Sequence, residues 1–128
     1  MGAARGTVMI VDDDAGVMQT FSKMLRLEGY DVATALDAET ALRTMEQTHP
    51  DAVLLDLHLP LMDGLVFLRL LRAREHDRHT PVAIITGDYS LNEKHIDEFR
   101  DLDAVVFFKP LWLEDLIGIT ERLLRTVH

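Results

Sequence analysis

The sequence contains no cysteine among its 128 residues. This absence excludes a disulfide framework, thiol chemistry and a cysteine-based zinc site, and it is typical of proteins from a reducing compartment. Long apolar runs are missing too, since runs such as 104–108 are far shorter than the about 20 residues that a membrane-spanning helix needs. Residues 1–7 lack the apolar middle region of a signal peptide. We therefore expect a cytoplasmic protein in which residues 1–6 form a disordered lead-in.

Basic residues are also scarce. The chain has 13 lysines and arginines against 22 acidic residues, which gives a net charge of −9. Such a surface repels phosphate backbones, so we expect no direct contact with nucleic acid and no membrane partner. If the negative charge is concentrated in one place, it suits a divalent cation or a basic protein.

Five short apolar runs alternate with five longer segments of helical periodicity. The predicted strands are residues 7–11, 31–35, 52–56, 82–86 and 105–108. Strands that are mostly apolar along their length belong in a parallel sheet covered on both faces, and strict alternation with helices gives a doubly wound α/β fold. No linker or internal repeat interrupts the pattern, so residues 1–128 are predicted to form one domain.

Two helix details rest on short patterns. Ser90-x-x-Glu93 has the form of a capping box, which predicts that the fourth helix begins at Ser90. The last helix, residues 113–125, is expected to bury four apolar side chains: Leu113, Leu116, Ile117 and Leu124.

Polar residues end four of the five predicted strands. Asp12 and Asp13 follow the first strand, and Asp56, Thr86 and Lys109 stand at the ends of the third, fourth and fifth. Parallel strands bring their carboxyl ends to one edge of the sheet, so these groups are expected to converge there. Crowded carboxylates attract a hard cation such as Mg²⁺. A carboxylate beside that cation can attack a phosphoryl group, while a lysine and a hydroxyl hold the transferring oxygens.

Four motifs carry a family resemblance. They are Val8-Met9-Ile10-Val11-Asp12-Asp13-Asp14, Leu55-Asp56-x-x-x-Pro60-x-x-Asp63-Gly64, Ile85-Thr86-Gly87 and Phe108-Lys109-Pro110. In order and spacing they resemble the receiver domain of two-component response regulators, of the kind that includes chemotaxis regulators. Each motif alone is weak, but the four together cover essentially the whole chain.

The resemblance implies a flavodoxin-like fold of five parallel strands in the order 2-1-3-4-5 with five helices. It also implies that Asp56 is the phosphoacceptor, receiving its phosphoryl group from a sensor histidine kinase or a histidine phosphotransfer protein. Mg²⁺ or Mn²⁺ would be held by Asp12, Asp13, Asp56 and the backbone carbonyl of His58.

Further roles follow from the same resemblance. Thr86 and Lys109 would contact the phosphoryl group, the bond before Pro110 would be cis, and His58 and Asp88 would tune the phosphoryl lifetime. The chain would be a signalling domain with weak self-phosphorylation and autodephosphorylation, and not an enzyme with a separate substrate.

The sequence departs from the family in two places. Val106 stands where many receivers carry a tyrosine or phenylalanine that reports phosphorylation. On the third helix, Val66, Leu70 and Ala73 fall on the side away from the sheet, where polar residues are usual. With Val106 and Trp112, these residues are candidates for contact with an output protein or domain, or with a second copy of the chain.

Two other functions remain open at this stage. The chain could be a receiver-like module that works by contact alone and takes no phosphate, for which Val106 is the argument. Asp12-x-Asp14 also resembles the nucleophile loop of haloacid-dehalogenase-type phosphatases, with Asp12 as the nucleophile. That second reading leaves Asp56 without a role, and Ala15-Gly16 follow where a threonine or valine is expected.

Overall fold

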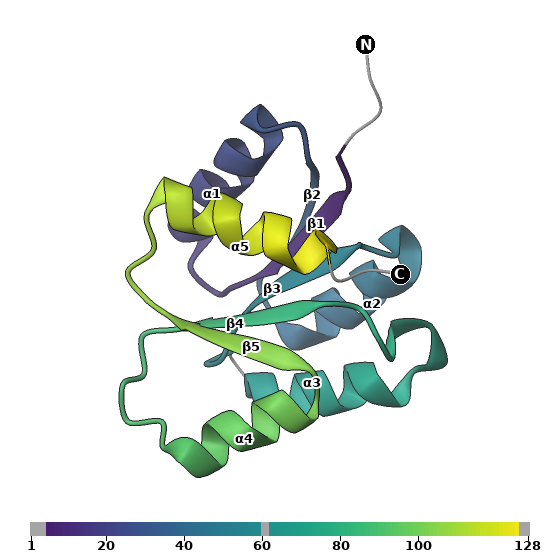
Figure 1. Cartoon of the computed structure of the whole chain (residues 1–128). Coiled ribbons are helices and arrows are strands. Elements are labelled where there is room, and N and C mark those ends of the chain that lie inside the picture. The colour runs from purple at the N-terminus through teal and green to yellow at the C-terminus, as the bar shows by residue number, and fades with distance from the viewer. Residues whose placement is uncertain (1–4, 60–61, 126–128) are drawn as a thin grey trace.

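The structure is a computed structural model that describes residues 5–59 and 62–125. Strands and helices alternate along the chain (Figure 1). The elements are β1 (Thr7–Val11), α1 (Ala15–Leu27), β2 (Asp31–Ala35), α2 (Ala38–Thr48), β3 (Ala52–Asp56), α3 (Gly64–Ala73), a 3₁₀ turn η1 (Glu75–Asp77), β4 (Val82–Thr86), α4 (Glu93–Asp101), β5 (Ala104–Phe108) and α5 (Leu113–Arg125). All strand pairs are parallel, in the order β2-β1-β3-β4-β5. The predicted fold class and strand order are confirmed.

Two apolar layers enclose the sheet. Side chains alternate between the faces of a strand, so Met9 and Val11 join the layer under α2, α3 and α4. Val8 and Ile10 join the layer under α1 and α5. Figure 1 shows the same division, with α1 and α5 on one side of the sheet and the other three helices opposite. Both layers are shielded from water, which explains why the strands are mostly apolar and do not alternate with polar residues.

An aspartate is the N-cap residue immediately before each of the first three helices. The carboxylates of Asp14, Asp37 and Asp63 each accept hydrogen bonds from backbone N–H groups in the first turn of α1, α2 and α3. An N-cap of this kind satisfies donors that the helix itself leaves unpaired.

The start of α4 differs from the prediction. Asn92 is the N-cap, its side chain accepts from the backbone N–H of His95, and the His95 ring accepts from the Asn92 N–H in return. Ser90 is drawn instead to Asp88, whose carboxylate accepts from both its N–H and its hydroxyl. The predicted capping box at Ser90 was therefore wrong, because a nearer carboxylate competes for the serine.

The buried stripe of α5 is also shifted. Leu116, Ile119 and Leu123 are buried together with Thr120, whereas Leu113 is exposed. The remaining predicted residues, Ile117 and Leu124, are only partly buried. The apolar pattern did not identify Thr120 as a buried residue. A polar side chain can lie there because its hydroxyl donates to Leu116 O within the helix, at 2.9 Å.

The first described residues are held against the domain. The Arg5 N–H donates to Gly29 O at 2.9 Å, and its guanidinium lies 4.7 Å from the centre of the Tyr30 ring. Gly6 O accepts from the Asp31 N–H at 3.0 Å. The predicted disordered lead-in thus needs correcting for these two residues, while residues 1–4 lie outside the described part. Among the described helices, none has the length and apolar character needed to cross a bilayer.

Candidate functional site: an aspartate cluster at the carboxyl edge of the sheet

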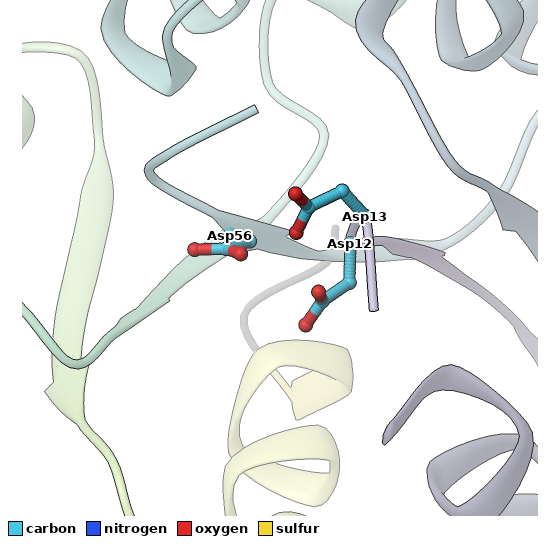
Figure 2. A group of neighbouring side chains, drawn as sticks. All are labelled: Asp12, Asp13 and Asp56. Carbon is cyan, nitrogen blue, oxygen red and sulfur yellow. The ribbon is translucent and has the colours of Figure 1, made fainter. Parts of the chain in front are cut away.

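Three carboxylates gather where β1 and β3 end (Figure 2). The two strands are neighbours and pair Val11 with Leu55, so Asp12 and Asp56 leave the sheet side by side. One oxygen from each of Asp12, Asp13 and Asp56 lies within 4.8 Å of the others. Asp12 is buried, and its Oδ1 accepts from the Asp14 N–H at 2.9 Å. The convergence of the three carboxylates that the strand ends predicted is present.

Lys109 brings the balancing positive charge from the end of β5. Its Nζ lies 3.6 Å from Asp12 Oδ2 and 3.9 Å from Asp56 Oδ2. The Lys109–Pro110 peptide that follows is cis. With all four groups ionised, the single ammonium neutralises only one of the three carboxylates, which leaves a local charge of about −2.

Burial raises the pKa of the Asp56 carboxyl above its ordinary value. The Lys109 ammonium opposes this rise, and the charges of Asp12 and Asp13 add to it. The His58 N–H, which donates to Asp56 Oδ1 at 3.3 Å, also favours the ionised form. The dominant cause is therefore loss of water around Asp56, so that this carboxylate is poorly solvated in its ionised form.

The donor set of the cluster fits a hard divalent cation. Three carboxylates within 4.8 Å of one another offer oxygen donors only, which suits Mg²⁺ or Mn²⁺ better than metals that prefer nitrogen or sulfur. The local excess of negative charge points the same way. Asp12, Asp13 and Asp56 would hold the ion, and the backbone carbonyl of His58 remains the predicted fourth protein ligand.

Thr86 is fully buried at the end of β4. Its Oγ1 accepts from the Asp88 N–H at 3.0 Å, so the hydroxyl is tied to the loop that leads into α4.

His58 and Asp88 meet across two loops. His58 Nε2 lies 3.0 Å from Asp88 Oδ2, which joins the loop after Asp56 to the loop after Thr86. Hydrogen bonds from the Ser90 hydroxyl and N–H, with a further one from His58, lower the pKa of Asp88 to about 2. Asp88 is therefore a carboxylate at neutral pH. The sequence singled out both residues but not their contact.

Gly64 allows the close return of the chain after Asp56. A Cβ at Gly64 would lie 2.9 Å from Leu57 Cα, closer than side chains normally come. The Gly64 N–H also donates to Leu57 O at 2.7 Å. The Asp63-Gly64 motif thus has a structural role, with Asp63 capping α3 and Gly64 fitting against Leu57, while Pro60 of the same motif lies outside the described residues.

The residues singled out as contact candidates lie in different settings. Val66 and Leu70 on α3 are 41% and 42% exposed, Ala73 beside them is exposed, and Trp112 before α5 is 71% exposed. Val106 is only partly exposed, because it packs into the apolar layer under α4.

Tyr89 and Phe108 form a contact that sequence reasoning missed. Their rings stack with centres 5.5 Å apart, and the Tyr89 hydroxyl donates to Lys109 O. Tyr89 thereby fastens the loop after Thr86 to the strand that carries Lys109. In the sequence, only its position three residues after Thr86 could have drawn attention to Tyr89, because the ring contact joins residues far apart in the chain.

We expect Tyr89→Ala to destabilise the fold by about 1 kcal/mol, the usual contribution of an aromatic pair. Tyr89→Phe keeps the stacking and should lose less. Urea denaturation followed by circular dichroism measures both. A denaturation midpoint of Tyr89→Ala equal to that of the wild type would show that the ring contact contributes nothing.

The fold and this site define a class: a doubly wound α/β domain with an aspartate cluster and a lysine at its carboxyl edge. The response regulator receiver domain matches residues 8–121, and the chain belongs to that family. The family predicted from the four motifs is confirmed, and with it the place of the domain in two-component signalling.

Particular relatives can be named. The chain is 34% identical over 124 residues to the transcriptional regulatory protein PrrA of Mycobacterium leprae, covering 97% of this chain and 52% of that protein. It is 33% identical over 118 residues to the regulatory protein AtoC of Escherichia coli, covering 92% of this chain and 25% of that protein. Among solved structures, chemotaxis protein CheY4 of Vibrio cholerae superposes with a TM-score of 0.85 at 27% identity, covering 95% of this chain and 99% of that one. The chain thus spans about half the length, or less, of these curated relatives.

Proposed function

We propose that the domain accepts a phosphoryl group on Asp56 in a reaction that depends on Mg²⁺ or Mn²⁺. The observation that carries the proposal is the cluster itself, with Asp12, Asp13 and Asp56 within 4.8 Å of one another and Lys109 at 3.6 and 3.9 Å from two of them. The donor would be a phosphohistidine on a sensor kinase or phosphotransfer protein.

In the proposed reaction, a carboxylate oxygen of Asp56 attacks the phosphorus atom and forms the O–P bond of an acyl phosphate. The N–P bond of the donor breaks, and its electron pair leaves with the imidazole. Lys109 already faces Asp56, so its ammonium is placed to neutralise an oxygen of the incoming group. A bound divalent cation would neutralise further charge on the transferring phosphoryl group.

A chemical phosphodonor tests the proposal. The untagged protein is incubated with acetyl phosphate and either Mg²⁺ or EDTA, and intact mass is measured. We expect an adduct of one phosphoryl group with Mg²⁺ only, and reductive trapping with borohydride followed by peptide mapping should locate it at Asp56. No adduct, under conditions in which a known receiver reacts, would favour a module that works by contact alone. An adduct on Asp12 would favour the phosphatase reading.

One contact speaks against the phosphatase reading. Asp14, which would serve as the second aspartate of that mechanism, has its Oδ1 engaged by the N–H groups of Gly16 and Val17 at 3.0 and 3.1 Å. It acts as the N-cap of α1. We therefore propose a signalling domain without a separate substrate.

The contact between His58 and Asp88 gives a kinetic prediction. Because it bridges the loop after Asp56 and the loop after Thr86, its loss should admit water more readily to an acyl phosphate there. His58→Ala should lose the phosphoryl group faster than the wild type, by a few-fold at most, since a single exposed polar contact contributes little.

Asp88→Ala removes the other side of this contact, together with the two hydrogen bonds that Asp88 accepts from Ser90. If the contact is what matters, either change should speed dephosphorylation similarly, and the double variant should add little. The rate is followed by intact mass after removal of the phosphodonor. An unchanged rate in His58→Ala would make that side chain a bystander.

Partners follow from the proposed role. We propose a cytoplasmic domain that exchanges contacts with an output protein, an output domain or a second copy when Asp56 is phosphorylated. The exposed apolar side chains of Val66 and Leu70 on α3 and the ring of Trp112 are the candidate contact points. The double variant Val66→Glu with Leu70→Glu tests whether these side chains contact a partner or are merely exposed. The added charge blocks an apolar contact without disturbing the core.

A further inference from the structure

A second cluster of polar side chains lies at the opposite edge of the sheet from Asp56. It lines a cavity of about 760 Å³ formed by the segments that lead into β3, β4 and β5, together with the end of α5. Three histidines contribute to its wall: His49, His76 and His79. Half of the six histidines in the chain therefore line one cavity, although they come from separate segments.

Two of these imidazoles are in contact. The ring centres of His49 and His76 are 4.1 Å apart, with the ring planes inclined by 57°. His49 caps the end of α2 and His76 belongs to η1, so the contact joins two segments that the sequence keeps far apart. His79 lines the same cavity three residues beyond His76, and its side chain is exposed.

The backbone of His49 is unusual for the residue it carries. It adopts the left-handed conformation, with φ of 47°, at a helix end where glycine or asparagine is common. Such conformations in non-glycine residues are sparsely populated and recur at functional sites. Here the residue in this conformation is a histidine that lines the cavity.

The surrounding charge favours a cation. Asp51, Glu75 and Asp103 line the cavity, against a single arginine, Arg122. One Asp51 oxygen already accepts from the Thr7 N–H at 2.8 Å, so Glu75, next to His76, is the more available carboxylate. Imidazoles flanked by carboxylates suit late first-row divalent metals, whereas Mg²⁺ prefers oxygen donors alone.

We propose that His49 and His76, with His79 as the third ligand, bind a divalent transition-metal ion such as Zn²⁺ at the amino-terminal edge of the sheet. The site is chemically distinct from the aspartate cluster and independent of phosphorylation at Asp56. His49 and His76 are already in contact. Among the described residues only the three aspartates hold three donor atoms within 4.8 Å of one another as they stand, so binding here requires the exposed His79 side chain to turn toward the other two histidines. A metal here would join α2 to η1 and the loop leading into β4.

Calorimetric titration of the untagged protein with Zn²⁺, in excess Mg²⁺, tests the site. We expect one Zn²⁺ per chain in the wild type and at least about tenfold weaker binding in His49→Asn and in His76→Gln, since loss of a ligand costs at least as much as loss of a supporting contact. Asparagine is chosen at position 49 because it tolerates the left-handed backbone. His79→Gln should weaken binding as well if this residue is the third ligand.

Two controls make the test specific. His95→Gln removes an imidazole from α4, keeps a side chain suited to its capping box, and should leave Zn²⁺ binding unchanged. Asp13→Asn alters the aspartate cluster and should also leave it unchanged. Circular dichroism checks that each variant is folded, and the imidazole nitrogen shifts of the wild type identify the ligands without any substitution. Absence of binding, or binding that survives both His49→Asn and His76→Gln, would overturn the proposal.

Discussion

Asp56→Asn is expected to take up no phosphoryl group and to melt at a higher temperature than the wild type when Mg²⁺ is absent. The first effect follows because an amide is not a nucleophile under these conditions. The second follows because burial and the charges of Asp12 and Asp13 make an ionised Asp56 unfavourable in the folded state. An asparagine of nearly the same shape removes that charge, so we expect a gain of a few degrees in Tm.

The gain should depend on pH in a defined direction. Because the pKa of Asp56 is raised in the folded protein, the folded state binds a proton more tightly than the unfolded state does. The contribution of Asp56 to the stability of the wild type then falls as pH rises from the ordinary value of 3.8 through the raised one, and this penalty is complete above it. Asparagine does not titrate, so the Tm difference between Asp56→Asn and the wild type should grow with pH and then level off.

Differential scanning calorimetry at several pH values measures this difference, and intact mass after acetyl phosphate treatment measures the acceptor function. Asp14→Asn is the matched control, since asparagine caps helices as well as aspartate does. It should be phosphorylated like the wild type. Added Mg²⁺ should stabilise the wild type more than Asp56→Asn. A lower Tm for Asp56→Asn in metal-free buffer would contradict the account of the crowded carboxylate.

Of the variants proposed here, Arg72→Ala should lower the stability of the fold the most. The Arg72 guanidinium donates to Leu102 O and Thr80 O, each at 2.7 Å, and to Asp77 O at 2.9 Å. A longer bond of 3.4 Å reaches Asp103 O. One side chain on α3 therefore supplies donors to carbonyls of η1, the entry to β4 and the turn before β5. Without it, partly buried carbonyls lose their donors, at a cost of about 3 kcal/mol and about 10 °C in Tm.

Two variants show whether these bonds are the cause. Arg72→Lys keeps the charge but cannot reach several carbonyls at once, so it should lie between Arg72→Ala and the wild type. Arg69→Ala, also on α3, removes only an exposed ion pair with Glu98 at 3.6 Å and should cost less than about 1 kcal/mol. If Arg72→Ala and Arg69→Ala unfold at the same urea concentration, the carbonyl contacts have no special role.

The aspartate cluster could be predicted because it depends on strand ends. Once the strands were assigned as parallel, Asp12, Asp56 and Lys109 had to meet at one edge, whatever the details of the loops. The separation of Val106 from Phe107 by strand alternation was predictable for the same reason, and the two residues do join opposite layers.

Contacts between loops were out of reach. Arg72 looks like an ordinary surface residue of an amphipathic helix, and only the folded chain shows the carbonyls that surround it. The pairs of His58 with Asp88 and His49 with His76 join segments whose approach is set by tertiary packing, which leaves no local pattern in the sequence. The shifted stripe of α5 has a related cause, since Thr120 satisfies its hydroxyl within the helix and so occupies a core position that hydrophobicity alone assigns to others.

The division of the interior into two apolar layers has an evolutionary consequence. A substitution beneath α1 or α5 meets different neighbours from one beneath α2, α3 or α4, since the strand backbones separate the two sets. Mutations on opposite sides should therefore be tolerated independently, and lineages can drift in one helical layer while the other is held by selection. Recognition surfaces can diversify in this way among descendants that keep the same aspartates.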